Sequence, residues 1–144
     1  MPMKIEAAPL LLDTHTWLWL MNGNLRQELP EINRQVELKA EKNAVYISAI
    51  SLLEVAMLDA KGRIELPMDC LLWIKRALNA PGIEVEDLSP EVAVASTRLA
   101  DAAPRDPSDR VIIASAMSLG AVLVTRDREI ISYCEANELP CLAF

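Results

Sequence analysis

The feature that most constrains the fold is the alternation of short apolar runs with longer stretches whose apolar residues recur at helical spacing. The runs PLLLD (9–13), AVYI (44–47) and AVLVT (121–125) predict buried strands. Alternation of apolar and acidic residues predicts an edge strand over 83–88, and 140–144 is expected to form a last short strand. The remaining spacing predicts helices over 14–21, 25–42, 48–61, 68–79, 90–100, 107–119 and 128–137. This order indicates an α/β fold with a mostly parallel central sheet flanked by helices on both faces.

The chain is expected to form a single domain over residues 1–144, with its core in about 9–143. Its 144 residues are the usual size of one domain, and no repeat or Gly/Ser-rich linker divides them. No apolar run reaches the roughly 18–20 residues that span a bilayer. The N-terminal apolar run is too short for a signal peptide. We therefore expect a cytoplasmic protein without a membrane segment.

The cysteine and histidine content argues against two classes of site. Cys70, Cys134 and Cys141 form no C-x-x-C pair, and an odd number of cysteines without a secretory signal does not indicate a disulfide framework. Because His15 is the only histidine, a zinc site of the Cys/His kind is not expected either. A metal bound by this chain would be a hard cation held by oxygen atoms.

Charge is distributed unevenly along the chain. Residues 1–80 carry 9 basic and 10 acidic side chains, whereas residues 81–144 carry 5 basic and 11 acidic ones. The net charge of −7 argues against a protein that binds nucleic acid through a broad basic face. It is compatible with a protein that handles phosphate through a bound cation, because the ion reverses the local charge.

Acidic side chains stand at one end of the predicted sheet. Asp13 ends the first strand, and Glu54 lies early in the helix after the second strand. Asp106 and Asp109 open the helix that precedes AVLVT, and Asp127 follows that strand. In open α/β sheets, ligands bind beyond the carboxyl ends of the strands. We therefore expect these acids to converge on one site.

Each acid also has a purely structural interpretation. Asp13, Asp106 and Asp127 stand where helix N-caps are expected. Asp109 lies where an acid favours the helix dipole, and Glu54 fits a capping box. Caps alone have no reason to converge, however, and two carboxylates ~4 Å apart repel by roughly 4 kcal/mol at an effective dielectric of ~20. A divalent cation removes this repulsion, and Mg²⁺ prefers carboxylate and water oxygens.

Basic and aromatic residues near the acids leave several interpretations open. The place of His15 near Asp13 suggests a catalytic role, and the alternative, which we favour, is a structural hydrogen-bonding residue. Trp17 and Trp19 are two positions apart and share no helix face, so one is expected in the core and the other at a partner surface, with base stacking as the alternative. Four arginines form either surface ion pairs or a rim that attracts a phosphate backbone: Arg105, Arg110, Arg126 and Arg128.

Three segments resemble PIN-domain proteins of the VapC toxin kind: LLLDTHTWLW, SAISLLEVAMLDAKGRIELP and DPSDRVIIASAMSLGAVLVTRD. The resemblance covers roughly residues 9–133, and Ile113 is a minor departure, because many members have a small residue there. It implies a PIN-like, Rossmann-like three-layer fold and a metal-dependent endoribonuclease that hydrolyses phosphodiester bonds of single-stranded RNA. The four family acids match Asp13, Glu54, Asp109 and Asp127.

The resemblance also implies roles, a cofactor and partners. Asp13, Asp109 and Asp127 would hold one or two Mg²⁺ or Mn²⁺ ions, and Glu54 would bind the metal or orient the attacking water. The implied partners are RNA, a cognate antitoxin protein and a second copy of the chain. The implied supporting residues are Asp106 as an outer or fifth acid, the hydroxyls of Thr14 and Thr125, and Arg110 and Arg126 as phosphate contacts.

Other classes of protein also use an aspartate at the end of a strand. Phosphatases that form a phospho-aspartate need a second acid where this chain has His15, and a receiver domain needs an acidic pair and a lysine that are not visible here. A PIN-like regulatory or interaction module that no longer cuts RNA stays open as the alternative. Replacement of Asp13 by Asn distinguishes it, because only a nuclease should lose its activity.

Overall fold

The computed structural model describes residues 7–144, so residues 1–6 of the expected domain lie outside the described part. Its five strands form one sheet in the order β3-β2-β1-β4-β5, and every neighbouring pair is parallel. The strands are β1 (Leu10–Leu12), β2 (Val45–Ser48), β3 (Ile83–Glu86), β4 (Val122–Thr125) and β5 (Cys141–Ala143). The helices are α1 (Thr14–Met21), α2 (Asn24–Glu28), α3 (Pro30–Ala40), α4 (Ala49–Ala60), α5 (Cys70–Leu78), α6 (Pro90–Ser96), α7 (Pro107–Leu119) and α8 (Arg128–Ala136).

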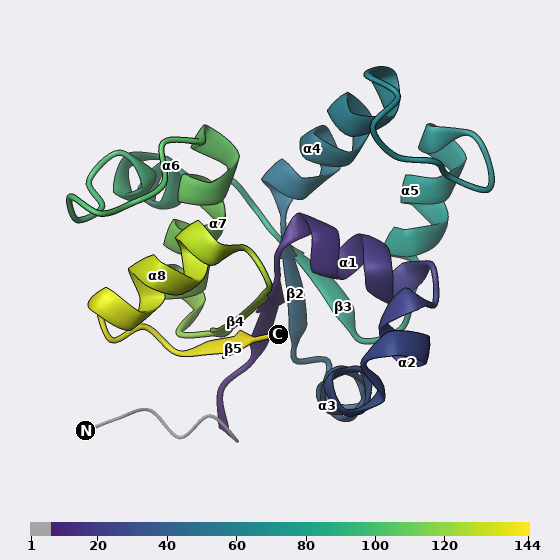
Figure 1. The fold of residues 1–144 in the computed structure, drawn as a ribbon, viewed down its shortest axis with the longest axis horizontal. Coiled ribbons are helices and arrows are strands. Elements are labelled where there is room, and N and C mark those ends of the chain that lie inside the picture. Colours follow the sequence, from purple (N-terminus) through teal and green to yellow (C-terminus); the bar gives the residue numbers. More distant parts are fainter. Residues whose placement is uncertain (1–6) are drawn as a thin grey trace.

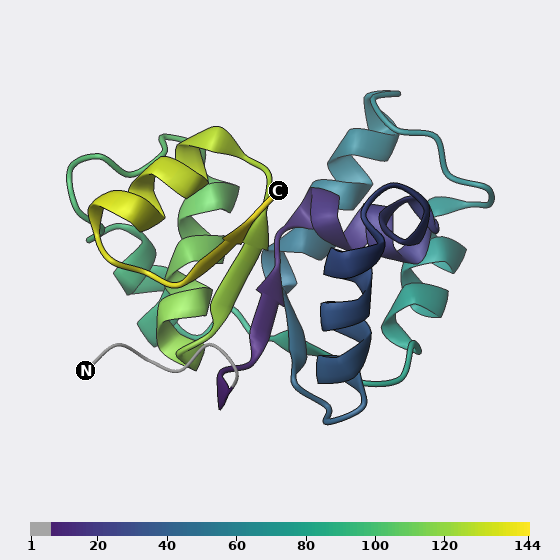
Figure 2. The same ribbon diagram turned by 60° about the horizontal axis from the view of Figure 1, so that its bottom comes forward.

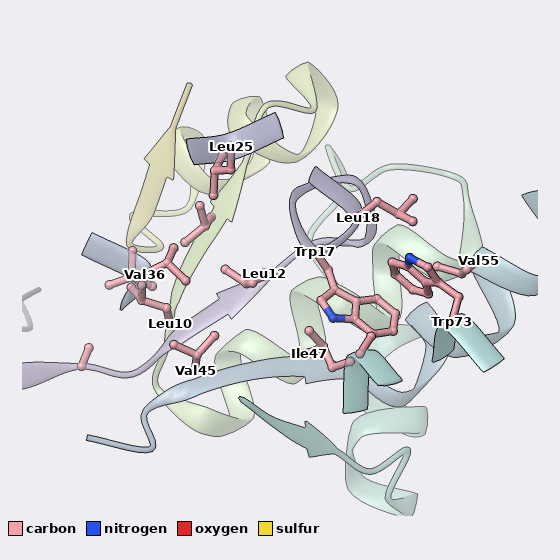
Figure 3. Close-up of a cluster of buried hydrophobic side chains, with 14 residues drawn as sticks. Leu10, Leu12, Trp17, Leu18, Leu25, Val36, Val45, Ile47, Val55 and Trp73 are labelled. Carbon is pink, nitrogen blue, oxygen red and sulfur yellow. The ribbon is translucent and has the colours of Figure 1, made fainter. Parts of the chain in front are cut away.

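The sheet is the middle of three layers, with α1–α5 on one side and α6–α8 on the other (Figures 1 and 2). Alternation along β1 explains the layers, because Leu10 and Leu12 face the first set of helices and Leu11 faces the second. Trp17 and Val55 pack in the first core (Figure 3). Fully burying such a side chain stabilises the fold by about 1.5–3 kcal/mol. The expected three-layer α/β architecture is confirmed.

Strand order reverses beside β1, and this reversal sets the place of the site. The chain leaves β1 through α1 on one face of the sheet and leaves β4 through α8 on the other (Figure 1). Since β1 and β4 are parallel neighbours, their carboxyl ends open onto the crevice where such sheets bind ligands. Thr16 ties the two together, because its hydroxyl donates to the carbonyl of Val124 at 3.1 Å.

The helix expected over 25–42 is wrong as a single element. It is divided into α2 and α3 at Leu29, whose φ of −135° and ψ of 65° are not helical. The cause is Pro30, since a proline disfavours helical geometry in the residue before it and suits the first position of a new helix. The helix expected over 90–100 is also too long, because α6 ends at Ser96.

The other elements agree closely with expectation. The bounds of α1 and α7 are those expected, and β3 and β5 are the two edge strands. Ser48 caps α4, with its hydroxyl accepting a bond from the backbone N–H of Ile50 at 3.2 Å. The three cysteines are free. Among residues 7–144, no helix is both long enough and apolar enough to span a bilayer.

Candidate active site

Asp13 directly follows β1 and is held at both carboxylate oxygens. Oδ1 accepts a hydrogen bond from the backbone N–H of Thr16 at 2.9 Å, which makes Asp13 the N-cap of α1. Oδ2 accepts a bond from the hydroxyl of Thr125. Only 5% of Asp13 is exposed. Because each carboxylate oxygen has two lone pairs, both oxygens keep one for a further ligand.

Thr125 joins the carboxyl ends of β1 and β4. Its buried hydroxyl donates to Asp13 and accepts a hydrogen bond from the backbone N–H of Asp127 at 2.9 Å. The carboxylate of Asp127 in turn caps α8, because its Oδ1 accepts a bond from the N–H of Ile130 at 3.0 Å. One hydroxyl therefore fixes the relative position of two acids from neighbouring strands.

Glu54 points back to α1 from the second turn of α4. The hydroxyl of Thr14 donates to its Oε1 at 2.6 Å, and Ser51 lies 2.8 Å from the same hydroxyl. Since Thr14 has one hydroxyl proton, it accepts from Ser51 when it donates to Glu54. Burial raises the pKa of Glu54, the Thr14 bond lowers it, and the charge of Asp106 raises it further. The carboxyl is thus shifted toward the pH range of a general base.

Two acids open α7. Asp106 is its N-cap, with Oδ1 accepting from the backbone N–H of Ser108 at 2.8 Å. Asp109 stands in the first turn, and within residues 7–144 no hydrogen-bond donor reaches its carboxylate. Burial is the largest cause that raises the pKa of Asp109, and together with the negative charges of Asp106, Asp127, Glu54 and Asp13 it brings the pKa to about 7. This carboxyl is therefore the strongest indication that the acids share one electrostatic environment.

The structure brings these acids together around one cavity of about 430 Å³. All five acids that we expect at the carboxyl end of the sheet line this cavity, together with a threonine hydroxyl, an aromatic ring and two basic side chains. The lining residues are Asp13, Thr14, His15, Trp19, Glu54, Asp106, Asp109, Ile112, Arg126 and Asp127. The structural and the functional interpretation of the acids therefore both hold: three of the acids cap helices, and these helices begin at the same cavity.

The two arginines expected to contact phosphate lie in different places. Arg126 lines the cavity, and its guanidinium carbon lies 4.7 Å from the centre of the Trp19 ring. Arg110 does not line it, because its Nε donates to the carbonyl of Ser96 at 2.8 Å and its Nη1 to that of Pro104 at 3.0 Å. The Arg110 guanidinium joins the end of α6 to the segment before α7, so its contacts in this structure are to backbone carbonyls.

His15 and the tryptophans also differ from one another. His15 is exposed and lines the cavity, and no hydrogen bond from its imidazole is found within the described residues, so its interpretation as a structural hydrogen-bonding residue stays a prediction. Trp17 is fully buried, with its ring centre 5.2 Å from that of Trp73. Trp19 is half-buried and lines the cavity. The expected division between one core and one outward tryptophan is confirmed.

The donor set fits a hard divalent cation. Carboxylate oxygens of Asp109, Asp127 and Glu129 lie within 4.8 Å of one another. Carboxylates are the ligands that Mg²⁺ and Mn²⁺ prefer in proteins. A cation among them would also offset the mutual repulsion that contributes to the raised pKa of Asp109.

Comparison with known families shows which family the chain belongs to. The family model described as the PIN domain matches residues 10–136. The chain is a PIN-domain protein. This PIN domain is 34% identical over 124 residues to ribonuclease VapC22 of Mycobacterium tuberculosis, a match that covers 86% of this chain and 91% of the relative.

Solved structures are similar to this PIN domain in fold. The crystal structure of VapBC2 from Rickettsia felis, bound to a DNA fragment from its promoter, matches with a TM-score of 0.67 and 19% identity over 93% of this chain and 97% of that one. DNA-bound VapBC from Salmonella typhimurium matches with a TM-score of 0.67 and 22% identity over 94% and 98%. At these identities the likeness shows the fold.

Sequence reasoning missed two polar residues next to the candidate site. Glu129 stands two positions after Asp127 in the first turn of α8, where an acid is also explained by the helix dipole. Ser51 is fully buried behind Thr14. The spacing in RDRE offered a weak signal for Glu129, whereas the contact of Ser51 depends on how α4 packs against α1.

Proposed function

We propose that this PIN domain is a divalent-metal-dependent endoribonuclease that hydrolyses phosphodiester bonds of single-stranded RNA. The observation that carries the proposal is the convergence of Asp13, Glu54, Asp109 and Asp127 on one cavity. The 34% identity to a protein named ribonuclease VapC22 supports it.

We propose four carboxylates as ligands of the metal. Carboxylate oxygens of Asp109, Asp127 and Glu129 lie within 4.8 Å of one another, and Asp13 adds a buried carboxylate at the cavity that Asp109 and Asp127 line. One or two Mg²⁺ or Mn²⁺ ions are proposed, and such an ion lowers the pKa of bound water and offsets charge on the phosphate. Asp106 is exposed at the rim and acts as an outer acid.

The remaining side chains orient the reacting groups. Glu54 is the proposed base that orients and deprotonates the attacking water, because burial raises its pKa toward neutrality. Thr14 fixes the carboxylate of Glu54, and Thr125 fixes that of Asp13. Arg126 is the proposed phosphate contact at the cavity, whereas the guanidinium of Arg110 is occupied by two carbonyls.

We also propose a toxin role in the cytoplasm, with a cognate antitoxin and a homodimeric state. The likeness to VapC22 and to two VapBC structures supports the antitoxin. Exposed apolar side chains on α4 and α5 give a partner protein apolar surface to cover. These are Leu53, Met57, Leu71 and Leu72.

Cleavage of single-stranded RNA with and without metal tests the function. The wild-type protein should cut RNA in Mg²⁺ or Mn²⁺ and stop in excess EDTA. Asp13→Asn should lower the rate by at least about 100-fold, while the exposed Glu91→Gln, a matched loss of charge on α6, should not change it. Undiminished cleavage in EDTA would remove the proposed mechanism. Toxicity in cells that survives Asp13→Asn would instead favour the non-catalytic interaction module.

A further inference from the structure

Three side chains from separate elements contact one another beside the acidic cavity, and two of them, Trp19 and Arg126, line it; we call this row of contacts the stack. The guanidinium of Arg126, in the segment between β4 and α8, lies 4.7 Å from the ring centre of Trp19 on α1. The ring of Trp19 in turn lies 6.3 Å from that of Phe144, just after β5, with the planes tilted by 50°. The backbone N–H of Phe144 donates to the carbonyl of Thr125 at 3.2 Å, so the stack is anchored beside the buried threonine of the site.

Arg126 lies beside several acids and forms no salt bridge with any acid of residues 7–144. Five acidic residues share the lining of the cavity with it. The salt bridges formed within residues 7–144 are Arg26–Glu37 and Arg34–Glu31, and neither involves Arg126. Within the same residues, no hydrogen bond from its guanidinium is found. Among residues 7–144, the partner of this cation is therefore the aromatic face of Trp19, not a carboxylate.

The contact with Trp19 leaves the guanidinium N–H groups of Arg126 without a hydrogen-bond acceptor among residues 7–144. Cation–π contact uses the face of the guanidinium plane, whereas phosphate is bound through N–H groups in that plane. An RNA strand brings several negative charges to a cavity that is already acidic, and cations among the carboxylates would offset only those nearest to them. Arg126 and the exposed His15 are the basic side chains that line the cavity. Arg126 is thus placed to receive a neighbouring phosphate.

We propose that Trp19, supported by Phe144, is a positioning residue that holds the guanidinium of Arg126 at the cavity rim, where it binds an RNA backbone phosphate adjacent to the scissile one. The inference rests on the proposed function for the identity of the ligand. Arg126 and Trp19 would thus form a binding subsite beside the acidic centre. Trp19 acts through Arg126, so the two side chains should behave as one unit in binding.

The test is the salt dependence of RNA binding. Fluorescence anisotropy with a short labelled single-stranded RNA measures Kd across about 50–200 mM salt, with every variant carrying Glu54→Gln to prevent cleavage. Arg126→Ala should weaken binding about tenfold and lower the slope of log K against log salt by about 0.7, the value for one phosphate contact on a single strand. Arg34→Ala, which removes the same charge from an exposed ion pair on α3, should leave the slope unchanged.

The role of Trp19 is tested by coupling and by rescue. Trp19→Leu should weaken RNA binding and lower the salt slope, as Arg126→Ala does. Trp19→Phe should restore most of the affinity and most of the slope. The double variant Trp19→Leu/Arg126→Ala should bind RNA no more weakly than Arg126→Ala alone. Thermal unfolding checks that Trp19→Leu folds. If it does not, Phe144→Leu gives the same test from the other end of the stack, with a smaller effect in the same direction.

The outcomes separate this inference from the proposed function. An unchanged slope in Arg126→Ala would overturn the phosphate contact. Additive losses in Trp19→Leu and Arg126→Ala would overturn positioning, because they would show that Trp19 contacts the bases by itself. The catalytic proposal is judged on cleavage by the protein without Glu54→Gln. If that protein does not cut RNA in any divalent metal while the slope results hold, the subsite stands and the catalytic proposal fails.

Discussion

At the scale of single residues, the pKa of Asp109 links the site to folding stability. Its value of about 7 lies above the ordinary 3.8, so without metal the folded state binds a proton that the unfolded state has lost. The free energy of unfolding of the metal-free protein should therefore fall as the pH rises from about 4 through 7. The full shift corresponds to about 4 kcal/mol, but the side chain is half-buried, and solvent screening reduces this to about 1–2 kcal/mol.

Asp109→Asn should consequently stabilise the metal-free protein at pH 8 by about 1–2 kcal/mol and have little effect near pH 4. Thermal unfolding in EDTA at several pH values measures the difference. The exposed Glu91→Gln is the control and should show no such pH-dependent gain. Destabilisation by Asp109→Asn at pH 8 would contradict the raised pKa.

The hydroxyl of Thr14 gives a second prediction at this scale. Its hydrogen bond to Glu54 lowers the pKa of that carboxyl. Thr14→Val, which keeps the shape and removes the donor, should raise the pKa further and move the acidic limb of the pH–rate profile upward. We expect slower cleavage on the acidic side of the profile and recovery as the pH rises. A uniform loss at all pH values would show instead that Thr14 supports packing or metal binding.

Some site residues could be predicted from the neighbouring sequence, whereas others depend on contacts between distant segments. Asp13, Asp106 and Asp127 could be placed from sequence because an acid between a strand and a helix, or before Pro107, is a local pattern. The contact between Ser51 and Thr14 joins residues 37 positions apart and depends on helix packing. No spacing rule encodes such a contact.

At the scale of elements, strands and helices were largely predictable because the apolar periodicity is strong. The break at Leu29 was missed because the apolar spacing of 25–42 continues across it, while Pro30 alone marks the boundary. The end of α6 was missed for a related reason, since the segment after Ser96 remains partly apolar but is not helical.

The turn between α5 and β3 provides a prediction at this scale. Gly82 has a φ of +82°, and a Cβ there would lie 2.0 Å from the carbonyl oxygen of Ala40. Gly23 has a similar φ of +83° with nothing within 4 Å. Gly23→Ala should cost about 1–2 kcal/mol from backbone strain, and Gly82→Ala at least about 2 kcal/mol more, because backbone atoms must move. Denaturant unfolding compares the two, and equal costs would refute the close approach.

At the scale of the whole molecule, the acidic half of the sequence and the topology of the sheet act together. Residues 81–144 carry 5 basic and 11 acidic side chains. The reversal of strand order beside β1 brings Asp109 and Asp127 from this half against Asp13 and Glu54 from the other half. The fold therefore concentrates like charge at one end of the sheet, which opposes folding unless a cation is bound there.

Divalent metal should accordingly stabilise the whole domain by more than ionic strength does. At a metal concentration about 100 times its Kd, binding contributes about 2.7 kcal/mol, which corresponds to a rise in Tm of roughly 5–10 °C for a chain of this size. Thermal unfolding in Mg²⁺ or Mn²⁺ is compared with NaCl at matched ionic strength, because NaCl screens charge without specific coordination. The Asp109→Asn/Asp127→Asn variant should lose the metal-specific rise and keep the NaCl response. Equal responses of the wild-type protein to both salts would mean that the acids repel without binding a metal, and the concentration of charge would then have no catalytic explanation.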